Sequence, residues 1–541
     1  MKKILALIFG MIFYCSLFSQ SDLLTTAEKS NFKSTSTYEE VVTFIKVVDE
    51  KSDIVKLEWY GKTTQGRDIP LIIIANPMVE DFKDLTTDDR VVVYIQANIH
   101  AGEVEGKESS QMLARFLSEN PDSEILKNCI VLINPILNAD GNEEFSTKHR
   151  TNQNGPESVG VRYNGQHLDL NRDAIKMESP EITSLVTNVL NTWDPAILVD
   201  CHTTNGSYHI EPVTFTWMMN PNSDRDLINF MRDDMMPEVH TTLFDKYKVE
   251  NVFYGEFIDR LNIDKGWISY ASEPRYVVNY IGVRNRLAIL NENYVYADFE
   301  SRVRGSYGLL LSILDYATKN SKNIKELLSK ADRKTIERGL NPTIADSFAI
   351  EYKGVACPEK VTIKAFEADT IPGVTGYWRY KQSDRQRTVT VDYIADYFPT
   401  KSIRFPFAYI LNVNDPEVLT NLKNHGVVVE KLENDTKLSV ETFKISSLKP
   451  SKRLNQGHYI NNIEGEFINE ELEFSKGTYI IRTSQKLGWL ISYLLEAQSD
   501  DGLLKWNYFD KYLVPQWGGS YYPYPVYRVV EKTELKTSGI Q

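Results

Sequence analysis

The stretch VVVYIQANIHAGE at residues 91–103 says most about the fold of this chain. Its first five residues form a continuous apolar run, which is typical of a strand buried on both faces. His100 and Glu103 follow this run, three residues apart. An imidazole and a carboxylate at this spacing can bind one metal ion together. The stretch therefore predicts a buried strand whose carboxyl end carries two metal ligands.

A third ligand is expected, because catalytic zinc sites use three protein ligands and leave one position to water. Residues 196–202 form a second buried-strand pattern, and it ends at His202. An H-x-x-E tetrad alone is weak evidence, since it often arises by chance on a solvated turn. The chain has only 8 histidines, however, and both His100 and His202 follow buried-strand patterns. Together with Glu103 they predict one zinc site.

Apolar strand patterns alternate with amphipathic helical patterns from about residue 35 to 320. Strands are expected at residues 69–74, 91–95, 129–136, 196–202 and 286–291, and helices at residues 106–117, 181–191, 224–247 and 299–318. This alternation predicts a doubly wound α/β fold with a largely parallel sheet that is covered on both faces. Ligands of such sheets bind beyond the carboxyl ends of the strands. His100, His202 and Glu292 all lie at such ends.

The composition changes after a polar helical segment at residues 321–346. Alternating segments at residues 360–366 and 388–391 are typical of strands with one wet face. Residues 408–412, 416–425 and 427–429 suggest strand, helix and strand. We therefore expect a catalytic domain at residues 21–320 and a helical linker at 321–346. A separate mixed α/β or β-rich domain, with no assigned role, is expected at 347–541.

Composition excludes some classes of partner. The chain is 42% hydrophobic and 25% charged, which is typical of globular proteins. Its 541 residues are too many for one typical hydrophobic core. The formal charge is −13 and basic residues are scattered, which argues against nucleic acid or an anionic membrane surface as a partner. The 4 cysteines show no framework spacing, so no disulfide scaffold is expected.

The N-terminus has the pattern of a secretory signal peptide. Basic residues at positions 2 and 3 precede an apolar run at 4–18, and polar residues follow at 19–21. The run is short for a membrane span, and no later segment reaches that length. We expect residues 1–20 to be removed, and the protein to be periplasmic or extracellular with no transmembrane segment.

Further motifs occur in a fixed order along the first half of the chain. They are NADG at 138–141, HRTN at 149–152, LDLNRD at 168–173 and GVRNRLAILNE at 282–292. With H-x-x-E and the strand-end His202, this ordered set resembles the zinc carboxypeptidases of the carboxypeptidase A/B type. The resemblance covers about residues 35–320 and is that of a divergent, bacterial-type exported member. It implies an α/β/α sandwich with a mixed sheet.

The resemblance also implies a role for individual residues. His100, Glu103 and His202 would bind one zinc ion per chain, and Glu292 would be the general base and later the general acid. Arg150 would polarise the scissile carbonyl, and Asp169 would orient a zinc-bound histidine. The substrate would be held by Asn171 and Arg172 at its terminal carboxylate and covered by Tyr270. The chemistry is consistent, because zinc activates water and a carboxylate can carry the proton to the leaving amine.

Alternatives remain at several positions. Arg162 competes with Arg150 for the oxyanion, and Tyr276 and Tyr280 compete with Tyr270. Asp169 could instead cap a turn, and Glu292 could be a surface carboxylate at a strand end. Spacing to Asn171 favours Arg150, and the buried pattern leading to Glu292 favours its catalytic role.

The leading functional hypothesis is an exported zinc metallocarboxypeptidase that hydrolyses an amide bond near a free carboxylate. Asp173 stands beside Arg172 where the family has asparagine, and an extra carboxylate there motivates a second hypothesis. That hypothesis is a zinc amidohydrolase acting on cell-wall peptides or N-acyl amino acids. A catalytically inactive binding protein is the third. All three ligands and the glutamate are present, which argues against it. The partner is expected to be a peptide or peptide-like substrate.

Overall fold

A computed structural model describes residues 23–539, apart from residues 81, 270 and 271. The expected signal peptide and Tyr270 therefore lie outside the described residues. Among the helices within the described part of the chain, none has both the length and the apolar composition of a membrane span.

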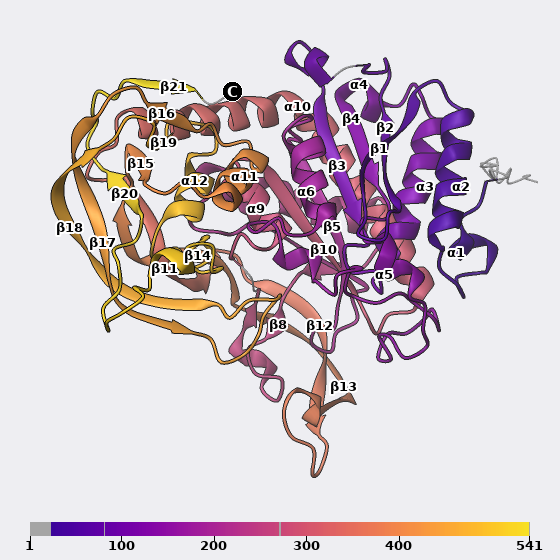
Figure 1. The fold of residues 1–541 in the computed structure, drawn as a ribbon. Helices are drawn as coiled ribbons and strands as arrows, with labels where there is room; N and C mark the ends of the chain where they lie inside the picture. The colour runs from indigo at the N-terminus through magenta and orange to yellow at the C-terminus, as the bar shows by residue number, and fades with distance from the viewer. Residues whose placement is uncertain (1–22, 81, 270–271, 540–541) are drawn as a thin grey trace, which may run out of the picture.

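A mixed sheet forms the centre of the N-terminal half (Figure 1). Its strands within the described residues are β1 (Val55–Lys62), β2 (Asp68–Ile74), β3 (Val91–Ala97), β4 (Cys129–Asn134), β5 (Ile197–Thr204), β6 (Val213–Trp217), β7 (Asn251–Phe253) and β10 (Leu287–Tyr294). They are ordered β1-β2-β4-β3-β5-β10-β6-β7. The central strands β4, β3, β5 and β10 are parallel, whereas β1, β2 and β6 pair antiparallel with their inner neighbours.

Helices cover both faces of this sheet. The face with α3 (Glu105–Glu119) and α10 (Phe299–Leu340) also carries α4 (Glu124–Asn128), α7 (Arg225–Phe230) and α8 (Met236–Asp245), which pack on α10. The opposite face carries α6 (Pro180–Leu185) and α9 (Val277–Val283). A further helix, α2 (Tyr38–Glu50), packs on α3 and β1. Two short helices, α1 (Thr26–Lys29) and α5 (Ala139–Glu143), complete this half. The predicted α/β/α fold class is confirmed.

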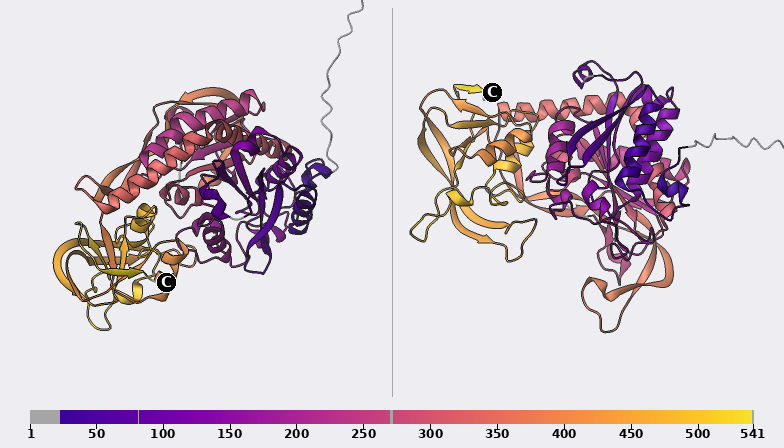
Figure 2. Two further views of the ribbon diagram at one scale, coloured as in Figure 1. Left: turned by 90° about the horizontal axis from the view of Figure 1, so that it is seen from above. Right: turned by 45° about the vertical axis from the view of Figure 1, so that its right-hand side comes forward.

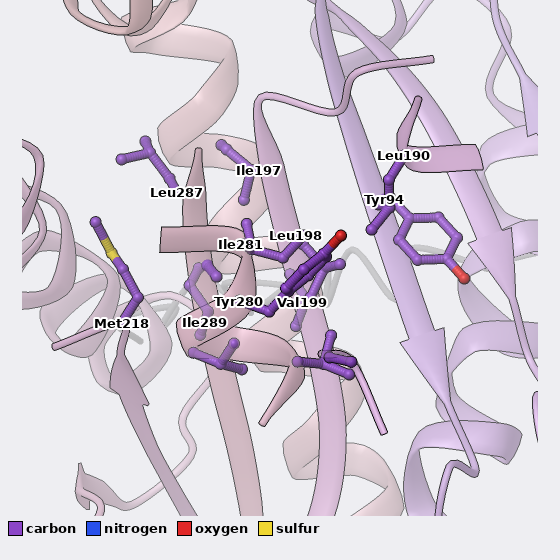
Figure 3. Packing of buried hydrophobic residues seen from close by; sticks show 14 of the residues in the cluster. Tyr94, Leu190, Ile197, Leu198, Val199, Met218, Tyr280, Ile281, Leu287 and Ile289 are labelled. Atoms are coloured by element: carbon purple, nitrogen blue, oxygen red, sulfur yellow. The ribbon is translucent and has the colours of Figure 1, made fainter. Parts of the chain in front are cut away.

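Buried aliphatic side chains join the sheet to its helices (Figure 3). Leu198 of β5 is fully buried and lies close to Tyr280 and Ile281 of α9, which packs on this strand. On the other face, α3 crosses β5 at Gly106. A Cβ at Gly106 would lie 2.3 Å from the Cβ of Cys201. Only glycine therefore allows α3 to approach β5 this closely.

The last helix of the N-terminal half is much longer than expected. The helix predicted at residues 299–318 and the polar segment after it form one helix, α10, which continues to Leu340. Figure 2 shows α10 running from the central sheet to the C-terminal part of the chain. The expected boundary at residue 320 therefore falls inside a helix. Ile324, Leu328 and Ala331 remain buried beyond this point, so the helix keeps an apolar stripe.

The C-terminal region, defined here as residues 347–539, contains a second large sheet. Its strands are β15 (Ala408–Leu411), β16 (Glu430–Leu432), β17 (Thr436–Pro450), β18 (Asn461–Phe474), β19 (Tyr479–Arg482), β20 (Val526–Val529) and β21 (Thr537–Gly539). Two helices, α11 (Pro416–Asn424) and α12 (Gly488–Leu495), pack with it. The strand expected at residues 427–429 begins three residues later, at Glu430.

One sheet contains strands of both the C-terminal region and the N-terminal half. β11 (Ser347–Ala356) and β14 (Tyr393–Arg404) pair with each other, and β14 also pairs with β9 (Trp267–Ile268), which in turn pairs with β8 (Glu256–Phe257). One further hairpin, β12 (Val361–Thr370) and β13 (Tyr380–Val391), projects from the body in Figure 1. A sheet shared by both halves therefore holds them together.

Candidate active site

Parallel pairing brings the predicted metal ligands together. His100 and Glu103 follow the carboxyl end of β3, and His202 lies near the end of β5, the next strand in the sheet. Glu292 of β10 stands opposite His202 in the register. All four side chains line one cavity of about 430 Å³. The sheet order thus brings residues from three distant segments to one place.

The three ligand residues form a triangle in which Glu103 presents one carboxylate oxygen to each histidine. The Nδ1 atoms of His100 and His202 are 3.1 Å apart. Glu103 places one carboxylate oxygen 3.2 Å from Nδ1 of His100 and the other 3.1 Å from Nδ1 of His202. Ligand atoms of tetrahedral zinc, with Zn–N bonds of about 2.0–2.1 Å, are separated by roughly 3.3 Å. These three residues therefore fit a zinc ion.

A carboxylate holds the far nitrogen of each histidine. Nε2 of His100 is 3.0 Å from Asp169, and Nε2 of His202 is 2.9 Å from Asp200. A hydrogen bond from each Nε2 to a carboxylate fixes the ring and leaves Nδ1 to face the metal. Sequence reasoning missed Asp200. Its signal was the spacing to His202, because residues two apart in a strand share one face.

Glu103 is held from two sides. One carboxylate oxygen accepts a hydrogen bond from Nη1 of Arg150 at 2.9 Å, and the other accepts one from the backbone N–H of Thr203 at 2.9 Å. Arg150 also donates to the carbonyl of Thr203 at 2.9 Å and to Gln153 at 2.7 Å. Its backbone has φ +46°, in the left-handed region. Arg150 is therefore fixed against the metal ligand.

Arg162, the rival for the oxyanion role, lines the same cavity. Its Nε donates to Asp169 at 2.8 Å, and its Nη1 lies 3.6 Å from Glu103. The side chain of Arg162 is 36% exposed, compared with 16% for Arg150. The two guanidinium groups thus flank Glu103, and the geometry supports an electrostatic role for both.

Burial affects the two cavity carboxyls differently. Burial raises the pKa of Glu292 to about 8, against the lowering effect of charge on His202. Burial also acts to raise the pKa of Glu103, but the positive charges of His100 and Arg150 outweigh it and hold that pKa well below its usual range. Environments that separate the pKa values of two carboxyls are typical of sites that assign them different tasks.

Asn171, Arg172 and Tyr276 form one end of the cavity. The Asn171 side-chain oxygen accepts a hydrogen bond from the backbone N–H of Val277 at 2.9 Å. The Arg172 guanidinium lies 4.2 Å from the ring centroid of Tyr276. Of the tyrosines proposed as rivals to Tyr270, Tyr276 therefore lines the cavity. Tyr280 is buried, and its hydroxyl contacts His425.

The Asp173 carboxylate forms its hydrogen bonds with Lys176 and Ser179 rather than with Arg172. It is fully buried and accepts hydrogen bonds from Lys176 at 2.9 Å and from Ser179 at 2.8 Å (backbone) and 2.6 Å (hydroxyl). The Arg172 side chain instead bonds the carbonyl of Asn171 at 2.7 Å and remains 25% exposed. The extra carboxylate in the sequence is thus satisfied by Lys176 and Ser179.

Uncharged side chains line another part of the cavity. Leu290 precedes Glu292 on the same face of β10, and Thr216 is its partner on β6. These two line the cavity with Trp217, Met219, Val278 and Asn279. These uncharged residues share the cavity with Glu256 of β8, which is paired with Arg260 at 3.1 Å.

A buried ion pair joins α10 to the start of α3, close to the metal ligand Glu103. Arg302 of α10 and Glu105 of α3 are both fully buried and bond each other, and Glu105 also accepts a bond from the Thr203 hydroxyl. Arg302 donates further to the carbonyls of Asn154 and Val295, at 3.0 and 3.3 Å, and to those of Ala297 and Gly155. This pair joins the segment after Arg150 to Glu105, two residues after Glu103, and to Thr203 of β5.

Comparisons with known proteins find similarity to carboxypeptidases. Residues 41–192 match the family model described as zinc carboxypeptidase. Carboxypeptidase 2 of Trichophyton tonsurans is 20% identical over 488 residues, which cover 86% of this chain and 81% of that protein. The solved carboxypeptidase A of Helicoverpa armigera aligns over 54% of this chain and 75% of its own, with 14% identity and a TM-score of 0.40. The family match confirms the predicted resemblance over residues 41–192, which include His100 and Glu103.

Proposed function

We infer that this chain acts as a zinc carboxypeptidase, because residues 41–192 match that family. We propose that it is exported and removes single residues from the free C-terminus of peptides. The observation that carries the proposal is the triangle of His100, Glu103 and His202 in one cavity with Glu292. Arg172, partly exposed in the same cavity, provides the positive charge for a terminal carboxylate.

His100, Glu103 and His202 would hold the zinc ion, which when bound activates water and polarises the carbonyl. Glu292 takes the proton of the attacking water and passes it to the leaving amine. Arg150, or Arg162 beside it, stabilises the developing oxyanion, which at comparable sites contributes about 3–4 kcal/mol. Asp169 and Asp200 keep the two imidazole rings in place.

Recognition of a free C-terminus is tested with pairs of peptides that end in a carboxylate or in an amide. We expect Arg172→Met to lower kcat/KM for the free peptide by about 10- to 100-fold, because a charge-assisted hydrogen bond contributes about 1.5–3 kcal/mol. Cleavage of the amidated peptide should be slow in both proteins. Arg333→Met, on the exposed side of α10, is the control.

The same assay includes chelated protein and protein to which zinc has been returned. Zinc-dependent cleavage of both peptide forms at equal rates would contradict the proposed exopeptidase activity. Zinc-dependent cleavage of N-acyl amino acids or cell-wall peptides, without cleavage of ordinary peptides, would favour an amidohydrolase.

The uncharged lining around Leu290 predicts a preference for the residue that is removed. Peptides ending in Phe or Leu should be cleaved with a kcat/KM at least about 30-fold higher than peptides ending in Asp or Lys, because an unpaired charge in an apolar site costs several kcal/mol. The measurement is a series of peptides that differ only in the last residue. Equal rates for Lys and Leu would show that the side chain does not enter this space.

A further inference from the structure

A tight turn of the C-terminal region contacts the segment that carries Arg172. Asn455 and His458 exchange backbone hydrogen bonds of 2.8 and 2.9 Å across this turn. The two residues between them, Gln456 and Gly457, have φ of +51° and +80°. These are the signs that a two-residue type I′ hairpin turn requires. The side-chain oxygen of Gln456, at the tip, accepts a hydrogen bond from the backbone N–H of Asp169 at 2.7 Å.

Asp169 contacts three residues that line the cavity. Its side chain bonds His100 and Arg162, and it lies 3.9 Å from Arg172. It also caps the 3₁₀ turn η2 (Leu170–Arg172), whose Asn171 N–H it binds at 3.0 Å. Gln456 therefore fixes the residue at which this turn begins. His458 anchors the same hairpin by a 2.8 Å contact with Glu178.

A second contact from the C-terminal region fixes the segment that faces Arg172. Asp501 is fully buried and accepts a hydrogen bond from the backbone N–H of Arg275 at 2.5 Å. It also lies 3.1 Å from Nε of Arg275 and accepts a bond from Trp506 at 2.9 Å. Arg275 directly precedes Tyr276, whose ring stacks on the guanidinium of Arg172.

We propose that Gln456 and Asp501 are positioning residues for the carboxylate-binding end of the cavity, so that the C-terminal region forms part of the substrate site. Gln456 acts on the turn that carries Arg172, and Asp501 acts on the segment that carries Tyr276. A binding group must be held within a fraction of an ångström to bind a planar carboxylate through two hydrogen bonds. This inference rests on the proposed carboxypeptidase function.

The test replaces Gln456 by methionine, which has the same length and no hydrogen-bond acceptor of comparable strength. For a peptide with a free C-terminus we expect KM to rise about 5- to 10-fold, the size of one lost hydrogen bond, while kcat changes less than about twofold. The preference for free over amidated peptide should fall by the same factor, and zinc content should not change. Asp501→Asn should have the same effects through Tyr276.

Gln485→Met is the matched control. Gln485 also belongs to the C-terminal region and accepts a hydrogen bond from a backbone N–H, that of Val428, at 2.9 Å. Its variant should keep the KM of the original protein. If Gln456→Met and Asp501→Asn lower kcat equally on both peptide forms and leave KM unchanged, their role is structural and the positioning inference is wrong. If the original protein does not distinguish the two forms, the proposed function itself is wrong.

Discussion

Glu292→Gln is expected to lower kcat by about 10²- to 10⁴-fold, the range that a general base contributes. The amide has the same shape as the carboxyl group but cannot take the proton of the attacking water. Because Glu292 lies in a strand opposite His202 and does not belong to the ligand triangle, the variant should keep its zinc. The measurement combines kcat at saturating peptide with metal analysis of the same sample.

Glu300→Gln is the matched control, since it makes the same chemical change on a half-exposed side chain of α10. It should leave kcat unchanged. A Glu292→Gln variant with full zinc and a kcat within a few-fold of the original would show that another group carries the proton. Loss of zinc from the variant would instead assign Glu292 a role in metal binding.

Arg302→Leu is expected to have the largest effect on stability. It would leave Glu105 charged, fully buried and without its partner, and breaking a buried pair in this way costs about 3–5 kcal/mol. Four backbone carbonyls, those of Asn154, Gly155, Val295 and Ala297, would also lose a donor. The free energy of unfolding should fall accordingly, as measured by the midpoint of denaturant-induced unfolding.

Arg304→Leu provides the control on the same helix. Arg304 pairs with Glu300 on the surface, and exposed pairs contribute about 0–1 kcal/mol. The double variant Arg302→Leu with Glu105→Leu should recover part of the lost stability, because it removes the unpaired charge. Equal unfolding midpoints for Arg302→Leu and Arg304→Leu would contradict the expected role of the buried pair.

The central sheet and the position of the ligands were predictable because their signals are local. A continuous apolar run such as residues 91–95 indicates a buried strand, and parallel strands present their carboxyl ends at one edge. His100, His202 and Glu292 each follow or end such a run. Their meeting in one cavity follows from the order of β3, β5 and β10.

Other features could not be predicted, because they depend on contacts between distant segments. β8 and β9 have two residues each, too few for a periodic pattern, and β9 pairs with β14 of the C-terminal region. The bond from Asp169 to Gln456 joins residues 287 positions apart. A helical linker was predicted at residues 321–346; the segment is helical as far as Leu340, but it continues α10 because it keeps a narrow apolar stripe.

The contacts of Gln456 and Asp501 also bear on the time at which activity arises during synthesis. The strands that carry the zinc ligands and Glu292 are complete once residue 294 has been made. The segments that fix Asp169 and Arg275 follow as much as about 200 residues later, which at about 5–20 residues per second is a delay of roughly 10–40 s. A chain that ended before residue 456 would therefore contain all the metal ligands but would lack both contacts that fix Asp169 and Arg275.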